Sequence, residues 1–325
     1  MKWSSACTKT VDGFMYVPVT FPYNIPDGLL IEDFDSEALI EHIHRNSLQK
    51  AYMLGVTDFS RFGKCSFLQH LYIELQLPFR IFTNCKKKGK KYVYTYDPSP
   101  LYQLSDLHSL TISNNERPDS KIYFTADLEN FPQLQLYYGE YGYVKHIESA
   151  SSLKSLVLSK FPHLNLDVLS SLSNLDTFKL SFSSVQSLHG ISAFSELKCL
   201  YLCNNRKLLD IADLLSVSKT LTALRIQNCP QITDFSVLHD MENLELLELW
   251  GTNELPDLSF IAGMPNLKTF IFNMNVRSGD LLPCLGLRYA YSANNRRHYN
   301  LKDEELPKVE FCHGNDSIEL WRRLE

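Results

Sequence analysis

Few residues in this chain have the types and spacing that catalysis or metal binding needs. Asp33 and Asp35 form a D-x-D pair of the kind that can hold a metal ion, and His42 and His44 follow closely. On a helix, side chains two residues apart point in different directions, so the two histidines do not act together. We favour the simpler interpretation, in which Asp35 caps a short helix and both histidines lie on its surface.

No catalytic motif accompanies these residues. The sequence has no glycine-rich phosphate loop, no H-E-x-x-H, no C-x-x-C and no G-x-S-x-G. His70 and Glu74 lie in or beside a predicted strand, and no further group converges on them. The sequence therefore predicts a protein that is not an enzyme and that binds no metal and no cofactor.

Eight cysteines raise the question of a disulfide framework. They lie without paired spacing at Cys7, Cys65, Cys85, Cys199, Cys203, Cys229, Cys284 and Cys312. Cys199 and Cys203 share one face of a predicted strand, but roughly 13 Å of extended chain separates them, so they do not chelate one ion. The chain starts without an apolar stretch of signal-peptide length, and no run approaches the roughly 20 apolar residues of a membrane span. We therefore expect a cytoplasmic protein with reduced cysteines.

Five lysines around one glycine are the strongest local charge feature. The run comprises Lys86, Lys87, Lys88, Gly89, Lys90 and Lys91. Flanking β-rich segments at Arg80–Thr83 and Tyr92–Tyr96 predict a hairpin with a basic tip, inserted near residues 79–97. Three interpretations stay open: contact with an acidic protein, binding of nucleic acid or acidic lipid, and simple solvation of the tip. The formal charge of −5, from 32 Lys plus Arg against 37 Asp plus Glu, disfavours nucleic acid.

The elements that position these residues follow from one repeated pattern. L-x-x-L-x-L-x-x-N recurs from Leu153 to Leu267, with starts 22, 22, 24, 23 and 23 residues apart. Its leucines at the first, fourth and sixth places face one way, and stacked copies bury them against one another. Weaker copies start at Leu48, Leu68, Leu107, Leu134, Leu287 and Leu306. The pattern therefore predicts about a dozen parallel strands.

The ninth place of each copy calls for a small polar side chain that bonds the backbone of the turn. It holds Ser183, Asn205, Cys229, Thr252 and Asn275 in five of the six central copies. The sixth holds Phe161, from which we expect an irregular turn and a locally bulged coil.

The repeats and their connecting segments, such as ITDFSVLHDMENL and LPDLSFIAGMPNL, resemble the leucine-rich repeats of the internalin type. The resemblance is clear over residues 150–290 and weak in the flanks. It implies an α/β leucine-rich repeat solenoid, a curved horseshoe with a parallel sheet on the concave face and short turns on the convex face. It also implies a binding module, although such repeats serve many unrelated partners.

The solenoid needs a cap at each end, because a terminal coil otherwise exposes its apolar edge. We expect an N-terminal cap over residues 1–47, with a strand pair at 14–23 and a helix at 35–46. The solenoid then occupies residues 48–305 and includes the hairpin insertion. A C-terminal cap follows over residues 306–325.

Partner binding is expected on the concave face, at the third, fifth, seventh and eighth places of the repeats. The candidates are Tyr138, Lys179, Phe182, Tyr201, Arg225, Glu248, Trp250, Ile271, Met274, Tyr289 and Tyr291. Aromatic residues, Met and Arg dominate the energetic centres of protein interfaces. The sequence thus favours a protein-binding module that acts as an intracellular inhibitor or immunity-type protein. The alternatives are an adaptor with several transient partners and nucleic-acid binding through the lysine hairpin, and a second copy of the chain is a further candidate for covering the face.

Overall fold

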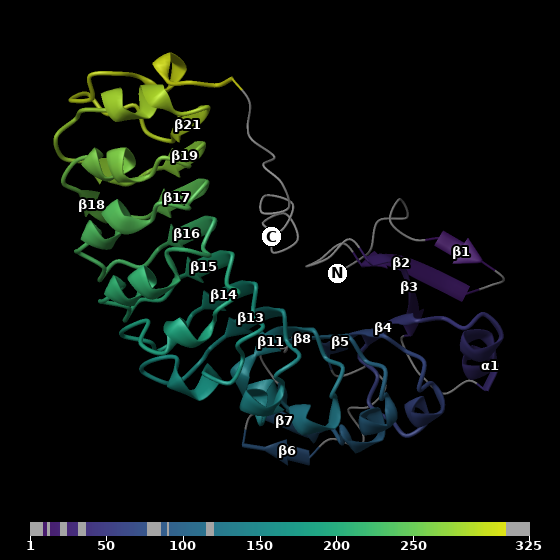
Figure 1. Cartoon of the computed structure of the whole chain (residues 1–325). Coiled ribbons are helices and arrows are strands. Elements are labelled where there is room, and N and C mark those ends of the chain that lie inside the picture. Colours follow the sequence, from purple (N-terminus) through teal and green to yellow (C-terminus); the bar gives the residue numbers. More distant parts are fainter. Residues whose placement is uncertain are drawn as a thin grey trace. The chain divides into compact units, whose positions relative to one another are not determined.

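The computed structural model describes residues 9–11, 14–19, 25–31, 37–76, 86–89, 91–114 and 120–309 (Figure 1). The chain divides into two compact units, one before and one after the junction between Leu153 and Lys154. We call them the N-terminal unit and the C-terminal unit. Within the described residues, no helix is long and apolar enough to span a membrane.

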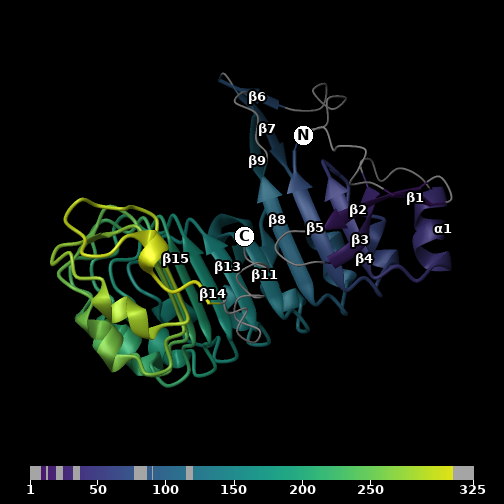
Figure 2. The same cartoon turned by 90° about the horizontal axis from the view of Figure 1, so that it is seen from above.

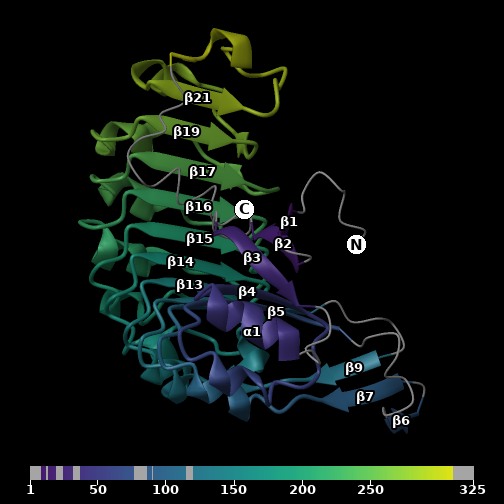
Figure 3. The same cartoon turned by 90° about the vertical axis from the view of Figure 1, so that its right-hand side faces the viewer.

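The C-terminal unit is a parallel sheet in which each repeat contributes one strand (Figure 3). Neighbouring strands pair in register along the unit. The strands are β13 (Ser155–Ser159), β14 (Thr177–Ser181), β15 (Cys199–Cys203), β16 (Ala223–Gln227), β17 (Leu246–Trp250), β19 (Thr269–Phe272) and β21 (Tyr289–Ser292). The repeat starts predicted from Leu153 to Leu287 are therefore confirmed.

The leucines of the pattern form the core of this unit. Leu200 and Leu202 of β15 are fully buried, as are Leu224 and Ile226 of β16 beside them. Burying each such side chain stabilises the fold by about 1.5–3 kcal/mol. Since no single coil encloses its own leucines, the stability comes from stacking one coil on the next.

Short 3-10 segments lie on the other side of the core from the sheet and return the chain to the next strand (Figure 1). In four successive repeats the segment begins after an aspartate, whose side chain accepts a hydrogen bond from the backbone two residues on, at 2.8–3.0 Å. These aspartates are Asp210, Asp234, Asp257 and Asp280. The single turns expected on this side, in place of long helices, are thus confirmed.

Buried polar side chains at the ninth place join the repeats laterally. Asn205 is fully buried, and its Oδ1 accepts hydrogen bonds from the amide and the hydroxyl of Ser183, at 3.0 and 2.7 Å. Its Nδ2 donates to the carbonyl of Leu180 at 2.9 Å. In the next repeat, Cys229 takes this place, and its thiol donates to the carbonyl of Leu202. The ladder thus ties the backbone of one coil to a buried side chain of the next, through hydrogen bonds that are made away from solvent.

Two expectations about the ladder are wrong. Thr252 is exposed, and Asn253 is the ladder residue instead, because Nδ2 of Asn253 donates to the carbonyls of Cys229 and Ile232. The turn at Phe161 is not irregular either. Lys160 before it has φ 54°, which matches φ 53° at Asn228, and Phe161 fills the core with no exposed surface.

The N-terminal unit continues the same pattern with less regular sequence. Its main sheet contains β1 (Lys9–Val11), β2 (Phe14–Val19), β3 (Ile25–Ile31), β4 (Lys50–Leu54), β5 (His70–Leu75), β8 (Ser109–Asn114) and β11 (Leu136–Glu140). The strands from β3 to β11 are parallel, which confirms the copies that start at Leu48, Leu68, Leu107 and Leu134.

The predicted N-terminal helix is present, whereas the strand pair beside it has different partners. Helix α1 spans Glu37–Arg45 and buries Ile43 completely. His42, which we expected on the helix surface, is also buried, whereas His44 is exposed. Asp33 and Asp35 lie outside the described residues. We expected a strand pair within residues 14–23, but β2 pairs antiparallel with β3, with a shift in register between Val17 and Val19. Pro18 lies at this shift and has no amide to donate to the ladder.

Three smaller sheets are also present among the described residues. Strands β6 (Lys86–Lys88), β7 (Lys91–Thr95) and β9 (Ser120–Tyr123) form one of them, in which β6 and β7 are the two arms of an antiparallel hairpin. The other two are the parallel pairs β10 (Ala126–Asp127) with β12 (Val144–Lys145), and β18 (Glu254–Leu255) with β20 (Asn275–Val276).

The copy expected to start at Leu306 does not continue the parallel sheet. Lys308 forms an isolated antiparallel bridge with Tyr289, and Leu306 is buried after a short 3-10 turn. The described chain therefore ends its parallel pairing at β21. Residues 310–325, where we expect a cap, lie outside the described residues.

Candidate recognition surface

One row of residues follows the face of the C-terminal sheet that points away from the leucine core. The row consists of Val157, Lys179, Tyr201, Arg225, Glu248, Ile271 and Tyr291, each paired with the next across adjacent strands. We call this side of the sheet the open face. The fifth-place register predicted from the leucine spacing is therefore confirmed, because strand residues alternate between the two faces.

The side chains of the open face are tightly packed. Tyr201 and Glu248 are only 6% and 7% exposed, and Ile271 is 8% exposed. Tyr291 at the end of the row reaches 36%. Most of the row is therefore nearly buried. Side chains on neighbouring strands pack against one another and shield one another from solvent, since adjacent strands are only about 4.8 Å apart.

A network of charges and rings organises the middle of the row. The ammonium of Lys179 lies 4.5 Å from the centre of the Tyr201 ring, and the guanidinium of Arg225 lies 4.7 Å from it. Nε of Arg225 also forms an ion pair with Glu248 at 3.1 Å. The same carboxylate accepts a hydrogen bond from the indole N–H of Trp250 at 2.9 Å. These five residues, Lys179, Tyr201, Arg225, Glu248 and Trp250, are named the central network.

Tyr201 is held in place through its hydroxyl and through its ring. Its hydroxyl donates to the side-chain carbonyl of Gln227 on the neighbouring strand. Burial raises its pKa well above the usual range, although Arg225 acts in the opposite direction, so the phenol stays protonated at neutral pH. The ring therefore presents a fixed surface between two cations, which is the geometry of cation–π attraction.

Phe182 lies at the carboxyl end of β14 and differs from every other candidate. It is 63% exposed, and its φ of 52° falls in the left-handed region. A bulky side chain in that region costs roughly 1–2 kcal/mol relative to an ordinary conformation. Equivalent turns hold Asn204 and Asn228, which tolerate this conformation better. The fold thus carries an exposed, strained ring where asparagine would fit.

The remaining candidates are divided among different environments. Met274 is 1% exposed and belongs to the interior, so it is not part of the surface we predicted. Tyr289 and Tyr291 both lie near the ammonium of Lys308, at 5.2 and 5.3 Å from the ring centres. Tyr138 is half-buried in the N-terminal unit, where it belongs to the row that runs through Tyr72 and Thr111.

That second row contains aromatic residues that our sequence analysis missed. Tyr52 and Tyr72 are paired on β4 and β5, with rings stacked at 4.3 Å, and Tyr138 continues the row beyond Thr111. The hydroxyl of Tyr52 donates to Glu74. The signal was present in the sequence, because both tyrosines occupy the fifth place of the copies that start at Leu48 and Leu68.

His70, on the same face, gives a prediction for pH dependence. Burial, with Lys50 and His108 nearby, lowers its pKa to about 4 from the usual 6.5. Folding therefore disfavours the protonated form, so stability is complete above pH 6.5 and falls as the pH drops toward 4. We expect His70→Gln to flatten the decline in urea-unfolding free energy over this range. The exposed His239→Gln serves as the control, and equal profiles for both variants would contradict this assignment.

The cysteines described by the structure are buried and free of disulfides. They are Cys65, Cys199, Cys203, Cys229 and Cys284. Burial raises the pKa of the Cys199, Cys229 and Cys284 thiols to about 12 in each case. Protonated thiols are poor nucleophiles and poor metal ligands, so these cysteines have a packing role.

One cluster has residue types that could hold a metal ion. Oxygen and nitrogen atoms of Asp127, Glu129 and His146 lie within 4.8 Å of one another. However, Lys145 forms an ion pair with Asp127 at 3.0 Å, and His146 bonds the other oxygen of that carboxylate at 2.9 Å. The carboxylate is thus already neutralised by its neighbours, which disfavours a cation at this place.

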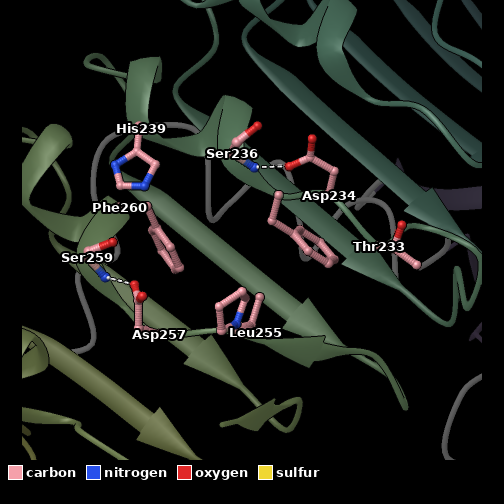
Figure 4. Close-up of a pocket in the computed structure, with 10 residues that line it drawn as sticks. Thr233, Asp234, Ser236, His239, Leu255, Asp257, Ser259 and Phe260 are labelled. Carbon is pink, nitrogen blue, oxygen red and sulfur yellow. Dashed lines mark hydrogen bonds between the residues drawn. The ribbon is translucent and has the colours of Figure 1, made fainter. Parts of the chain in front are cut away.

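A pocket of about 180 Å³ lies among the return segments, between Phe235 and Phe260 (Figure 4). Asp234 and Asp257 line it, but each accepts a hydrogen bond from the amide of the serine two residues on. These amide bonds, together with the serine hydroxyls, lower the pKa of both carboxyl groups. The two carboxylates of the pocket are therefore engaged in capping the 3-10 turns.

Known structures share this architecture. A crystal structure of the internalin InlF from Listeria monocytogenes matches over 82% of this chain and 79% of its own length, with 18% identity and a TM-score of 0.54. This chain folds as a leucine-rich repeat protein. A leucine-rich repeat protein of Leptospira interrogans matches over 82% of this chain and 71% of its own, with 17% identity and a TM-score of 0.55. No family model matches this leucine-rich repeat protein, and no curated protein resembles it in sequence. At such identities the likeness shows the fold alone.

Proposed function

We propose that this leucine-rich repeat protein is a non-catalytic recognition module that binds a protein partner on the open face of its C-terminal unit. The observation that carries the proposal is the central network. Its side chains take no part in the leucine core, yet Arg225 and Glu248 are held in place by one another and by the rings beside them. Residues that are ordered without contributing to the core are available for recognition.

The composition of the network supports protein binding in particular. Trp, Tyr and Arg are the residues most enriched at the energetic centres of protein interfaces. Because Lys179 and Arg225 are already held on the Tyr201 ring, their side chains would lose little further entropy when a partner docks there. The cationic groups of Lys179 and Arg225 outnumber the single carboxylate of Glu248, which favours a partner that presents acidic groups.

Our more specific proposal is an intracellular inhibitor or immunity-type protein, which would have one tight partner. The buried, free cysteines support a reducing compartment such as the cytoplasm. An adaptor would instead show several partners of weaker affinity. The number of partners and the strength of binding therefore separate these two functions.

Phe182 provides the sharpest test of the binding surface. Phe182→Gly removes the strained ring, so we expect the free energy of unfolding to rise by about 0.5–1 kcal/mol. If Phe182 contacts the partner, binding weakens at least tenfold at the same time, since a buried aromatic anchor contributes 2 kcal/mol or more. A gain in stability together with a loss of binding is not expected of a residue that serves the fold.

The experiment begins with affinity capture from native lysate at moderate salt, using the tagged chain as bait. Affinity for the captured protein is then measured by calorimetry with the wild type, Phe182→Gly and Lys179→Ala. Leu215→Ala is the matched control, because Leu215 is 54% exposed on a return segment. Unchanged affinity in both test variants, or an equal loss in Leu215→Ala, would rule out the open face.

A further inference from the structure

The sheet formed by β6, β7 and β9 carries a second set of candidate residues, on a different element from the open face. Strand pairing places Lys86 opposite Val93, and Val93 opposite Lys121 of β9. Lys88 pairs with Lys91, and Thr95 pairs with Tyr123. Since residues alternate along a strand, these positions share one face of the sheet. The sequence predicted a hairpin here, but with all its lysines in the tip, whereas Lys86–Lys88 form the arm β6. The arm predicted at Arg80–Thr83 lies outside the described residues. Strand β9 was not predicted, because it joins the sheet from a segment nearly thirty residues later.

The opposite face of this sheet packs against the N-terminal unit. Ile122 is 5% exposed, and the hydroxyl of Tyr94 donates to the carbonyl of Thr57 at 3.2 Å. Just after β7, Tyr96 is buried and stacks on Phe59 at 5.7 Å. The lysine positions therefore lie on the face that points away from the body of the unit.

The sheet extends beyond the ends of β5 and β8 (Figures 2 and 3). Gly89 forms its exposed turn with φ 63°, a conformation that suits glycine. Lys121 and Thr95 are exposed, and Tyr123 is 46% exposed. A basic sheet that is anchored at one end and exposed at the other is accessible to a large polymeric ligand.

The chemistry of this face fits a chain of phosphates with unpaired bases. The cations on the shared face are all lysines, which act on phosphate as point charges. The ammonium of Lys121 lies 5.0 Å from the centre of the Tyr123 ring, so a cation and an exposed aromatic surface stand side by side. Proteins that bind single strands combine these two features, with cations along the backbone and rings that stack on bases.

We propose that the β6–β7–β9 sheet binds single-stranded nucleic acid, with the lysines on the phosphates and Tyr123 against a base. The negative formal charge of the whole chain does not oppose this, because screening limits electrostatic influence to about 10 Å at 0.1 M salt. Binding here does not depend on the protein-recognition function, which uses residues of the other unit.

Fluorescence anisotropy with a labelled 20-nucleotide oligo-dT tests the proposal in the full-length chain between 50 and 200 mM salt. If the four lysines of the shared face each contact one phosphate, the logarithm of affinity should fall with the logarithm of salt with a slope of roughly −2.8. Changing the hairpin lysines Lys86, Lys87, Lys88, Lys90 and Lys91 to Ser should remove most of this slope and lower affinity at least tenfold. Tyr123→Ala should weaken binding at least about fivefold and leave the slope unchanged.

The matched control changes five exposed lysines of the C-terminal unit to Ser, which alters the formal charge equally. They are Lys154, Lys160, Lys198, Lys207 and Lys219. The proposal fails if the oligonucleotide does not bind, or if the control variant loses as much affinity as the hairpin variant. It also fails if polyglutamate or phosphatidylserine vesicles bind the same lysines more tightly, which would assign the sheet to an acidic protein or a membrane surface.

Discussion

Asn205→Ala should lower the free energy of unfolding by about 3–5 kcal/mol. The substitution leaves the buried amide of Ser183 without a partner and removes the acceptor of the Ser183 hydroxyl, and it also removes the hydrogen bond to the carbonyl of Leu180. Each buried polar group left unsatisfied costs about 1–3 kcal/mol. The amide nitrogen and oxygen of Asn205 serve different groups, so no rotation of a smaller side chain compensates for their loss.

Urea unfolding followed by far-UV circular dichroism measures this change. Asn243→Ala is the control, because Asn243 is exposed and makes a single hydrogen bond to the carbonyl of Lys219 at 2.8 Å. We expect the control to lose less than about 1 kcal/mol. If both variants are equally stable, the lateral ladder does not hold the coils together.

Glu248→Ala should lower the free energy of unfolding by about 2–4 kcal/mol. The side chains of Glu248 and Arg225 are only 10% and 14% exposed, so removing the carboxylate leaves a largely desolvated cation without its ion pair. It also removes the acceptor of the Trp250 indole N–H. Breaking one half of such a pair is more destabilising than removing both halves.

A double-mutant cycle measures the coupling. The sum of the losses in Glu248→Ala and Arg225→Met should exceed the loss in the double variant by about 1–3 kcal/mol. Raising the salt concentration should reduce this coupling only slightly, because largely buried pairs are weakly screened. Additive losses would show that the two residues do not act as a pair, and that the central network is not preorganised in the way we propose.

The regular spacing of leucines made the register of the C-terminal unit predictable. In β15 and β16, Leu200, Leu202, Leu224 and Ile226 leave Tyr201 and Arg225 only one face to occupy. The same logic applied to β4 and β5 places Tyr52 and Tyr72 on the second row. Local alternation is therefore enough to assign the face of a residue.

The environment of a residue on its face was less predictable. Tyr201 is nearly buried because Lys179 and Arg225 on the two neighbouring strands lie over its ring, and the repeat pattern does not constrain those positions. Met274 and Phe182 both occupy the eighth place of their repeats. Met274 lies in the interior, whereas Phe182, which has a left-handed φ, is exposed. Such differences come from turn conformation and from neighbours about 23 residues away, which the spacing of leucines does not encode.

In the lateral ladder, the side chain that completes each coil comes from the following repeat, and this order matters when the chain is synthesised. The amide of Ser183 is satisfied by Asn205, the carbonyl of Cys229 by Asn253, and the amide of Val276 by the hydroxyl of Tyr299. In each case a coil depends on a side chain that the ribosome makes later. A nascent coil thus stays incomplete until the next repeat has emerged, about 1–5 s at 5–20 residues per second. During that interval its newest edge is open to chaperones and to mispairing with other chains.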